Sequence, residues 1–176
     1  RQRRAQESTE QKNRLSLQEK TLSDRIRLLS EMEKEYEGFS KAVKIVMRAA
    51  EARTLSGVHG PVGNLIHADK DCSVAIEIAL GGALQHSIVD TKNDGKNAIG
   101  LLKQRDGGRA TFLPLDTIRG RSLRENGLEN EYGFVGVASE LVRYEEKYSA
   151  VVENLLGTTV VVEDLDCGIQ MAKRHD

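Results

Sequence analysis

Apolar residues in the N-terminal third of the chain recur at intervals of seven. One position of this repeat is apolar through five heptads, at Leu15, Leu22, Leu29, Tyr36 and Val43. The position three residues further on is polar at first and then becomes apolar, at Met32, Phe39 and Val46. Such spacing is typical of a coiled coil. It predicts a helical arm over residues 1–53, with a continuous helix from Leu15 to Val46.

This arm cannot bury its apolar seam alone, so the pattern also predicts a partner helix. The partner is a second strand of coiled coil, from the same polypeptide or from another. The alternative is an amphipathic helix that packs on its own domain. The strict seven-residue spacing and the polar N-terminal part of the seam favour the arm.

From residue 54 onward the pattern changes to short apolar runs that are separated by glycine. The expected elements are a short strand within 58–66, a helix over 71–80, a strand over 86–90, a helix over 94–103 and a strand over 110–113. Gly81 and Gly82 end the first of these helices, and Pro114 closes the last strand. This alternation indicates an α/β lobe over residues 54–120.

The same pattern returns in the last third of the chain. The blocks at 136–142 and 148–157 match earlier blocks at a constant offset of 76 residues, which pairs Leu65 with Leu141, Glu77 with Glu153 and Gly81 with Gly157. After a three-residue gap, residues 160–163 match residues 87–90. This duplication predicts two similar lobes related by an approximate twofold axis, the second over 133–176 and joined to the first by a polar linker over 121–132.

The second repeat stops at Asp176, where the counterpart of the strand at 110–113 would begin. We therefore expect the second lobe to be truncated and an unpaired strand edge to remain there. The first residue is Arg and not Met, which also indicates a piece of a longer protein.

Composition limits the class of protein further. Hydrophobic residues make up 39% of the chain but aromatic residues only 4%, so the core must consist mainly of aliphatic side chains. Residues 1–53 hold 13 Lys and Arg against 9 Asp and Glu, and residues 54–176 hold 13 against 18. The arm is thus mildly basic and the domain mildly acidic, which argues against polyanion binding as the main role of the domain.

Cysteine usage and hydropathy bear on the compartment. Cys72 and Cys167 lie far apart without a C-x-x-C motif, which disfavours a disulfide framework or a zinc site. Neither a signal peptide nor an apolar run of membrane-spanning length is visible. A reduced, cytoplasmic setting with no membrane contact is therefore expected.

The sequence offers no constellation for catalysis. The glycines at 57, 60 and 63 resemble a phosphate loop, but the G-K-[ST] that opens its helix is missing. His59, His67 and His86 lack metal-ligand spacing, and Ser73 and Ser87 lie in no nucleophile elbow. No catalytic residue, metal or cofactor is expected.

Several long blocks, taken together, resemble a known family. G-V-H-G-P-V-G-N-L-I, A-I-E-I-A-L-G-G-A-L-Q-H, G-R-A-T-F-L-P-L-D and G-V-A-S-E-L-V with V-E-N-L-L-G look like the hinge domain of bacterial SMC (structural maintenance of chromosomes) proteins. The resemblance covers roughly residues 50–176, and the arm matches the coiled coil that enters such a hinge. The expected fold is therefore α+β and SMC hinge-like, with two pseudo-repeated mixed α/β lobes preceded by a long coiled-coil helix.

The resemblance implies a function for the chain. SMC hinges join two SMC chains into a homodimer by pairing sheet edges of one lobe with the other lobe of the partner. A returning coiled-coil helix of the same protein connects the hinge to a distant ATPase head, and the whole molecule compacts and segregates chromosomes in the nucleoid. Family hinges also contact DNA weakly and without sequence specificity, near the coiled-coil junction.

Carried onto this sequence, the resemblance gives two sets of candidate residues. The candidate dimer interface comprises Phe112, Leu113, Pro114 and Leu115, with the turn at Gly81 and Gly82. The candidate DNA contacts are Lys41, Lys44, Arg48, Arg53, Arg105 and Arg109. The preferred function is a dimerisation hinge, and the alternative is a module that primarily binds DNA at a coiled-coil junction. An enzyme on an α/β fold is the third class, which the missing motifs disfavour.

Overall fold

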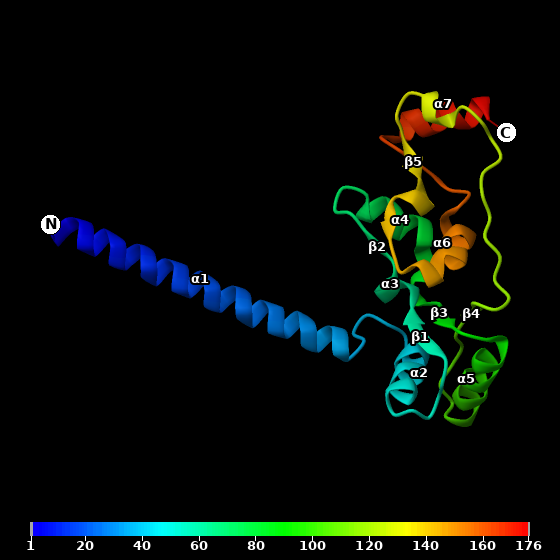
Figure 1. The fold of residues 1–176 in the computed structure, drawn as a ribbon, viewed down its shortest axis with the longest axis horizontal. Helices are drawn as coiled ribbons and strands as arrows, with labels where there is room; N and C mark the ends of the chain where they lie inside the picture. The colour runs from blue at the N-terminus through cyan, green and yellow to red at the C-terminus, as the bar shows by residue number, and fades with distance from the viewer. Residues whose placement is uncertain (1, 176) are drawn as a thin grey trace. The chain divides into compact units, whose positions relative to one another are not determined.

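The computed structural model describes residues 2–175, and these form two compact units that divide between Phe39 and Ser40. The first unit is a single long helix, α1 (Gln2–Lys34), followed by a turn (Figure 1). Its apolar seam is open to solvent within this chain, as Leu22, 60% exposed, illustrates. The prediction of a long N-terminal helix ahead of an α+β domain is thus confirmed, and its partner helix stays a prediction.

The predicted continuity of this helix from Leu15 to Val46 is wrong. Helix α1 ends at Lys34, and Tyr36 and Gly38 then take positive φ angles of 54° and 87°. A separate helix, α2 (Lys41–Glu51), begins at Ser40, whose hydroxyl accepts a hydrogen bond from the backbone N–H of Val43. Because a left-handed turn and a serine N-cap stop one helix and start another, the arm ends near Phe39 and not at residue 53.

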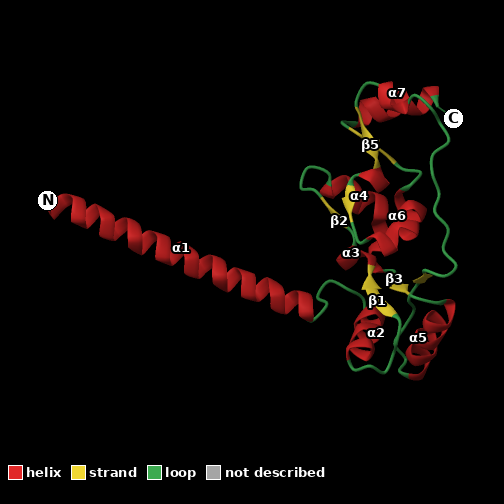
Figure 2. Ribbon diagram, viewed as in Figure 1, coloured by secondary structure: helices red, strands yellow, loops and turns green. Residues whose placement is uncertain are grey.

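The first lobe is built on a three-stranded sheet with the order β1-β3-β4. Strand β1 (Val58–Pro61) runs antiparallel to β3 (Ser87–Val89), and β4 (Phe112–Pro114) runs parallel to β3. One face of the sheet is covered by α2 and by α5 (Lys92–Gln104), whose apolar side chains form a small core of their own (Figure 2). Val43 and Val46, assigned to the coiled-coil seam by the heptads, are 1% and 0% exposed here.

The centre of the second unit contains two sets of short elements, one set from each lobe. In the first lobe these are α3 (Val62–Leu65), β2 (His67–Ala68), α4 (Ser73–Leu80) and the 3₁₀ helix η1 (Gly81–Gln85). In the second lobe they are η3 (Ala138–Glu140), β6 (Val142–Arg143), η4 (Glu146–Tyr148) and α6 (Ser149–Leu156).

The outer part of the second lobe is a two-stranded sheet with one helix. Strand β5 (Phe134–Val137) pairs antiparallel with β7 (Val160–Val162), and α7 (Leu165–Arg174) packs on β7. A short 3₁₀ helix, η2 (Leu128–Asn130), precedes β5. Between η2 and β4 runs an extended segment, residues 118–127, which we call the strap (Figure 1).

The predicted twofold relation of the lobes is confirmed by strand pairing. Strands β2 and β6 pair antiparallel, and His67 faces Arg143 across the ladder. These two residues are separated by the repeat offset of 76, so the pseudo-twofold axis passes between them. Strands β1 and β5 also carry bulges at equivalent places, between Val58 and Gly60 and between Phe134 and Gly136.

The two lobes share one core that straddles this axis. Buried residues in it fall into pairs related by the repeat: Val62 and Ala138, Ile66 and Val142, Ile76 and Val152, Leu80 and Leu156, Ile88 and Val161. Helices α4 and α6 contact each other at its centre. Because the same core stabilises both lobes, neither lobe is an independent folding unit within the described residues. In the part of the chain that the structure covers, none of the helices is long and apolar enough to cross a membrane.

Candidate interaction surfaces

Strand β4 leaves one edge of the first sheet open. The backbone N–H of Ser87 donates to the carbonyl of Thr111, and the N–H of Leu115 donates to the carbonyl of Val89. Because the hydrogen-bonding direction alternates along a strand, Thr111, Leu113 and Leu115 face β3. Phe112 therefore directs its backbone N–H and carbonyl away from the sheet, toward the open edge.

Pro114 ends this edge. It has no N–H to offer, and its carbonyl accepts hydrogen bonds from the N–H groups of Thr117 and Ile118. A proline at such a place blunts an edge strand against uncontrolled pairing. The outward backbone groups that could pair with another strand are thus those of Phe112 and of Ala110, two residues before it.

The side chains of the candidate interface point mostly inward. Leu113 and Leu115 pack on the core shared by the lobes, and Phe112 packs on the core beneath α2 and α5. The Cβ of Phe112 lies 3.4 Å from where a Cβ on Gly95 would be, which is an ordinary van der Waals distance. The backbone of β4, more than its side chains, is the surface that a partner could use.

Among the described residues, β7 also has one edge without a strand beside it. The N–H of Ala138 donates to the carbonyl of Thr159, and the N–H of Glu163 donates to the carbonyl of Gly133. These bonds place Thr159, Val161 and Glu163 toward β5. Val160 and Val162 therefore face the other side, where the described residues contain no third strand.

An apolar groove of about 300 Å³ runs along this second edge. Its floor is Val160 and Val162, one wall is α7 with Gly168 and Met171, and the other wall is the strap with Leu123. Gly168 is the repeat counterpart of Gly95, on which Phe112 packs in the first lobe. None of these groove residues was a candidate from the sequence, although the repeat offset relates them to the residues around β4 in the first lobe.

The two glycines of the candidate interface are the exposed first residues of η1, directly after α4. Gly81 has a φ of 49°, and a Cβ at either Gly81 or Gly82 would find no atom within 4 Å. Gly82 also borders a cleft of about 740 Å³. The other walls of this cleft are the start of α2, the end of α5 and the segment 108–111 that leads into β4.

The structure places the six candidate DNA contacts in two groups, at opposite ends of α2. The Nζ atom of Lys41 donates to the carbonyl of Asp106 at 3.1 Å, which joins the start of α2 to the end of α5. Lys41, Arg105 and Arg109 therefore lie at one end of this helix pair, with Lys44 one turn along α2. Arg48 and Arg53 lie at the other end of α2. Arg48 is about 10 Å from Lys41 along the helix axis, at ~1.5 Å per residue.

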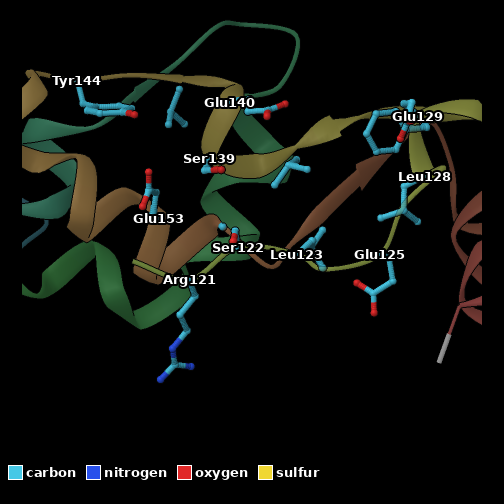
Figure 3. A pocket seen from close by; sticks show the side chains of 14 residues that line it. Arg121, Ser122, Leu123, Glu125, Leu128, Glu129, Ser139, Glu140, Tyr144 and Glu153 are labelled. Carbon is cyan, nitrogen blue, oxygen red and sulfur yellow. The ribbon is translucent and has the colours of Figure 1, made fainter. Parts of the chain in front are cut away.

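Another cleft, of about 610 Å³, lies under the strap (Figure 3). Its acidic lining residues are Glu125, Glu129, Glu140 and Glu153, and Arg121, its one basic lining residue, directs its side chain away from the cleft. A concave surface lined by carboxylates repels polyanions. Any nucleic-acid contact is therefore expected at the α2 and α5 end of the domain.

A hydrogen-bonded chain of side chains ties the two lobes together. His59 lies in the bulge of β1, and its Nε2 atom is 2.6 Å from the carboxylate of Asp90, which can only accept. In the neutral ring Nδ1 is then an acceptor, and the hydroxyl of Tyr148 donates to it at 3.0 Å. Burial raises the pKa of Tyr148, so this phenol stays protonated and remains a donor.

Two acidic groups of the second lobe are stabilised in their charged form. The backbone N–H of Cys167 donates to Asp164 at the N-terminus of α7, and this hydrogen bond lowers the pKa of Asp164. Hydrogen bonds from His175 and from Arg174 lower the pKa of Glu131. The first interaction caps the N-terminus of α7, and the second joins its C-terminal end to Glu131. Within residues 2–175 no group of three or more His, Cys, Asp or Glu is placed to hold a metal ion.

The described residues thus comprise a long helix followed by an α+β domain in which two lobes share one pseudo-twofold core. The chain belongs to the SMC hinge family, because the family model described as SMC proteins Flexible Hinge Domain matches residues 55–172. The resemblance found in the sequence is thus confirmed.

Similar proteins agree with this assignment. The chain is 42% identical over 149 residues to Chromosome partition protein Smc of Bacillus subtilis (strain 168), and 40% identical over 151 residues to the protein of that name from Methanocaldococcus jannaschii. These matches cover 83% and 86% of this chain but 12% of each relative. The chain therefore spans about an eighth of the length of the curated relatives that it matches.

Solved structures show the same fold. The hinge domain in an asymmetric dimer of the Geobacillus stearothermophilus SMC hinge has a TM-score of 0.83 and 41% identity, covering 88% of this chain and 62% of that one. The Pyrococcus furiosus SMC hinge domain has a TM-score of 0.64 and 26% identity, covering 80% of this chain and 71% of that one.

Proposed function

We propose that this chain is the hinge through which two SMC chains join in a chromosome-partitioning protein. The observation that carries the proposal is the open sheet edge at Phe112 on β4. Extended segments readily bind such edges through main-chain hydrogen bonds. A similar hinge domain is described as an asymmetric dimer, which supports the same role here.

Sedimentation equilibrium over a range of concentrations tests the proposal. We expect a dimer that the substitution Ala110→Pro weakens roughly tenfold or more, because one outward N–H of the β4 edge is lost. Ala110→Val keeps that N–H and is the matched control. Thermal unfolding of both variants establishes that the fold is retained.

The outcome that contradicts the proposal is a monomer at every concentration. It must hold both for this chain and for one extended past Asp176 to the length of the solved hinges. A dimer that Ala110→Pro and Ala110→Val leave equally stable would move the contact away from β4.

DNA binding is the second candidate function, and the grouping of Lys41, Arg105 and Arg109 at one end of the α2 and α5 pair favours it. Their cationic side chains would contact phosphates without reading sequence. We expect fluorescence anisotropy to detect weak duplex binding that falls steeply with salt. The variant Arg105→Glu/Arg109→Glu should abolish it, whereas Arg53→Glu should reduce it less. Equal loss in both variants would argue against a localised site.

The remaining parts of the proposal concern the whole protein. A returning coiled-coil helix would cover the exposed seam of α1 at Leu15, Leu22 and Leu29. The ATPase head would lie elsewhere in the polypeptide, and this domain would need no cofactor. A chromosome-partitioning role implies a cytoplasmic protein associated with the nucleoid.

A further inference from the structure

The cleft beside Gly82 has walls that carry only positive charge. Its volume is about 740 Å³, which lies in the range of pockets that bind small molecules. Its charged lining residues are Lys103, in the last turn of α5, and Arg109, ahead of β4. None of the described residues that line it is Asp or Glu. The cleft therefore favours an anion, in contrast to the cleft under the strap.

Both cations are available to a ligand. The side chains of Lys103 and Arg109 are exposed, and neither is paired with a carboxylate in the described part of the chain. The nearby Lys41 is already engaged, because its Nζ atom donates to the carbonyl of Asp106. Carboxylate, sulfonate and phosphate groups accept charge-assisted hydrogen bonds from Lys and Arg. Two such donors on one rim suit a single anionic group.

The interior of the cleft is apolar. Val43 of α2 and Leu102 of α5 line it and are 1% and 3% exposed, and Ile99 of α5 lines it and is 42% exposed. An inorganic ion would gain nothing from these side chains, because the hydrophobic effect acts only where apolar surface leaves water. A ligand that uses the whole cleft thus has an apolar body as well as a charged group.

One polar atom at this cleft has no partner. His86 lines the cleft, and its Nδ1 atom is buried without a hydrogen bond from any of the described residues. Burial lowers the pKa of His86, so the ring is uncharged near neutral pH. Nδ1 then donates or accepts according to the tautomer. Buried polar atoms nearly always have a partner, and a hydrogen-bonding group on a ligand would supply one.

Hydrogen bonds between elements hold the walls of the cleft in place. The N–H of Ser40, at the start of α2, donates to Oε1 of Gln85 in η1 at 2.9 Å. Lys41 joins α2 to the end of α5, and the N–H of Ser87 donates to the carbonyl of Thr111. Figure 2 shows α2 and α5 beside each other at this end of the domain. The cleft is thus formed before a ligand binds, which lowers the cost of binding.

We propose that this cleft binds a small organic anion with an apolar body. The charged group lies against Lys103 and Arg109, the body lies against Ile99, and a hydrogen-bonding group meets His86. Duplex DNA would use the two cations but not the apolar interior, since its base faces are stacked inside the helix. The proposal depends neither on dimerisation nor on DNA binding.

A fluorescence titration with anilinonaphthalene sulfonate (ANS) tests the proposal. This probe carries a sulfonate and an N–H group on an aromatic body. N-phenylnaphthylamine has the same ring system without the sulfonate and is the matched control ligand. We expect ANS to occupy one site on this chain and to bind roughly tenfold more tightly than N-phenylnaphthylamine, because only the sulfonate can bind the two cations.

Substitutions in the cleft separate the contributions of charge and of apolar surface. The variant Lys103→Gln/Arg109→Gln should weaken ANS binding roughly tenfold or more and change N-phenylnaphthylamine binding less than about twofold. Ile99→Asp should weaken the binding of both probes, because it places a carboxylate in the apolar part. Arg48→Gln, at the other end of α2, is the matched control and should leave both affinities unchanged. Thermal unfolding establishes that each variant is folded.

Nuclear magnetic resonance locates the bound probe. Signals of His86 and Thr111 that shift on ANS addition, together with weaker binding in the double variant, support the proposal. Shifts confined to Val74 and Ile78, which are 67% and 76% exposed on α4, would mean adsorption to open apolar surface and overturn it. Equal affinities of the two probes, or a double variant that binds ANS as the wild type does, would overturn it as well.

Discussion

At the scale of single residues, glycines decide where backbone segments can approach one another. Gly157 and Gly82 both follow the last turn of a helix but have opposite surroundings. A Cβ on Gly157 would collide with the strap, whereas a Cβ on Gly82 would meet no atom within 4 Å. The two glycines differ because the strap passes beside Gly157 and no segment passes beside Gly82.

We therefore expect Gly157→Ala to destabilise the domain by about 1–3 kcal/mol, the usual cost of forcing extra volume into a packed site. Gly82→Ala is the matched control and should change the free energy of unfolding by less than about 0.5 kcal/mol. Urea unfolding at neutral pH measures both. Equal effects would show that the strap is not fixed against α6.

The lowered pKa of Asp164 links the stability of the domain to pH. Its pKa is lowered in the folded state by the backbone N–H of Cys167. A lowered folded-state pKa contributes stability above the unfolded pKa of ~3.9, and this contribution is lost as pH falls through the folded value. Asp164→Asn keeps the N-cap without titrating.

We expect the wild-type protein to lose more stability than Asp164→Asn between pH ~5 and ~3, the range in which the ordinary Asp pKa lies. Urea unfolding at several pH values measures the difference. Glu131 titrates in both proteins, so its contribution cancels. Identical pH profiles would rule out Asp164 as a source of acid sensitivity.

At the scale of elements, one heptad pattern runs through both α1 and α2, although its apolar residues are exposed in the first helix and buried in the second. Leu22 on α1 is exposed within the chain, whereas Val46 on α2 is fully buried beneath the first sheet. Gly38 and Ser40 separate the two helices, although the seven-residue spacing passes through them without interruption.

Two substitutions distinguish these surroundings. We expect Val46→Ala to lower the free energy of unfolding of the domain by about 1.5–3 kcal/mol, because two buried methyl groups are removed and a cavity remains. Leu22→Ala should leave the same transition unchanged within about 0.5 kcal/mol. Near-ultraviolet circular dichroism during urea unfolding follows the domain, since tyrosines such as Tyr148 lie in it. A large effect of Leu22→Ala would place α1 in the domain core.

At the scale of the whole domain, one core shared by both lobes makes their folding cooperative. Leu156 in the second lobe and its counterpart Leu80 in the first belong to this core. The hydrogen bond between His59 and Tyr148 adds a polar contact between the lobes. Stability is thus a property of the pair of lobes.

We expect Leu156→Ala to destabilise the domain by about 2–5 kcal/mol and to raise amide hydrogen exchange in α5 as much as in α7. Hydrogen exchange read by mass spectrometry compares the two helices directly. Increased exchange in α7 alone would mean that the lobes unfold separately.

Much of this architecture was predictable from the sequence alone. The repeat offset of 76 determined the twofold relation that the pairing of His67 with Arg143 confirms. Glycine and proline positions located the ends of α4 and β4, because their backbone constraints act locally. Each of these follows from local chemistry or from self-similarity, which a sequence contains in full.

Only the tertiary structure decided which surfaces are free. Phe112, Leu113 and Leu115 were one candidate interface in the sequence, but the fold turns the leucine side chains into the shared core and leaves outward the backbone of Phe112. It also assigned Val46 to the domain and left Ile78 bare. Periodicity specifies that a face is apolar, but the neighbour that covers it comes from residues distant in the chain.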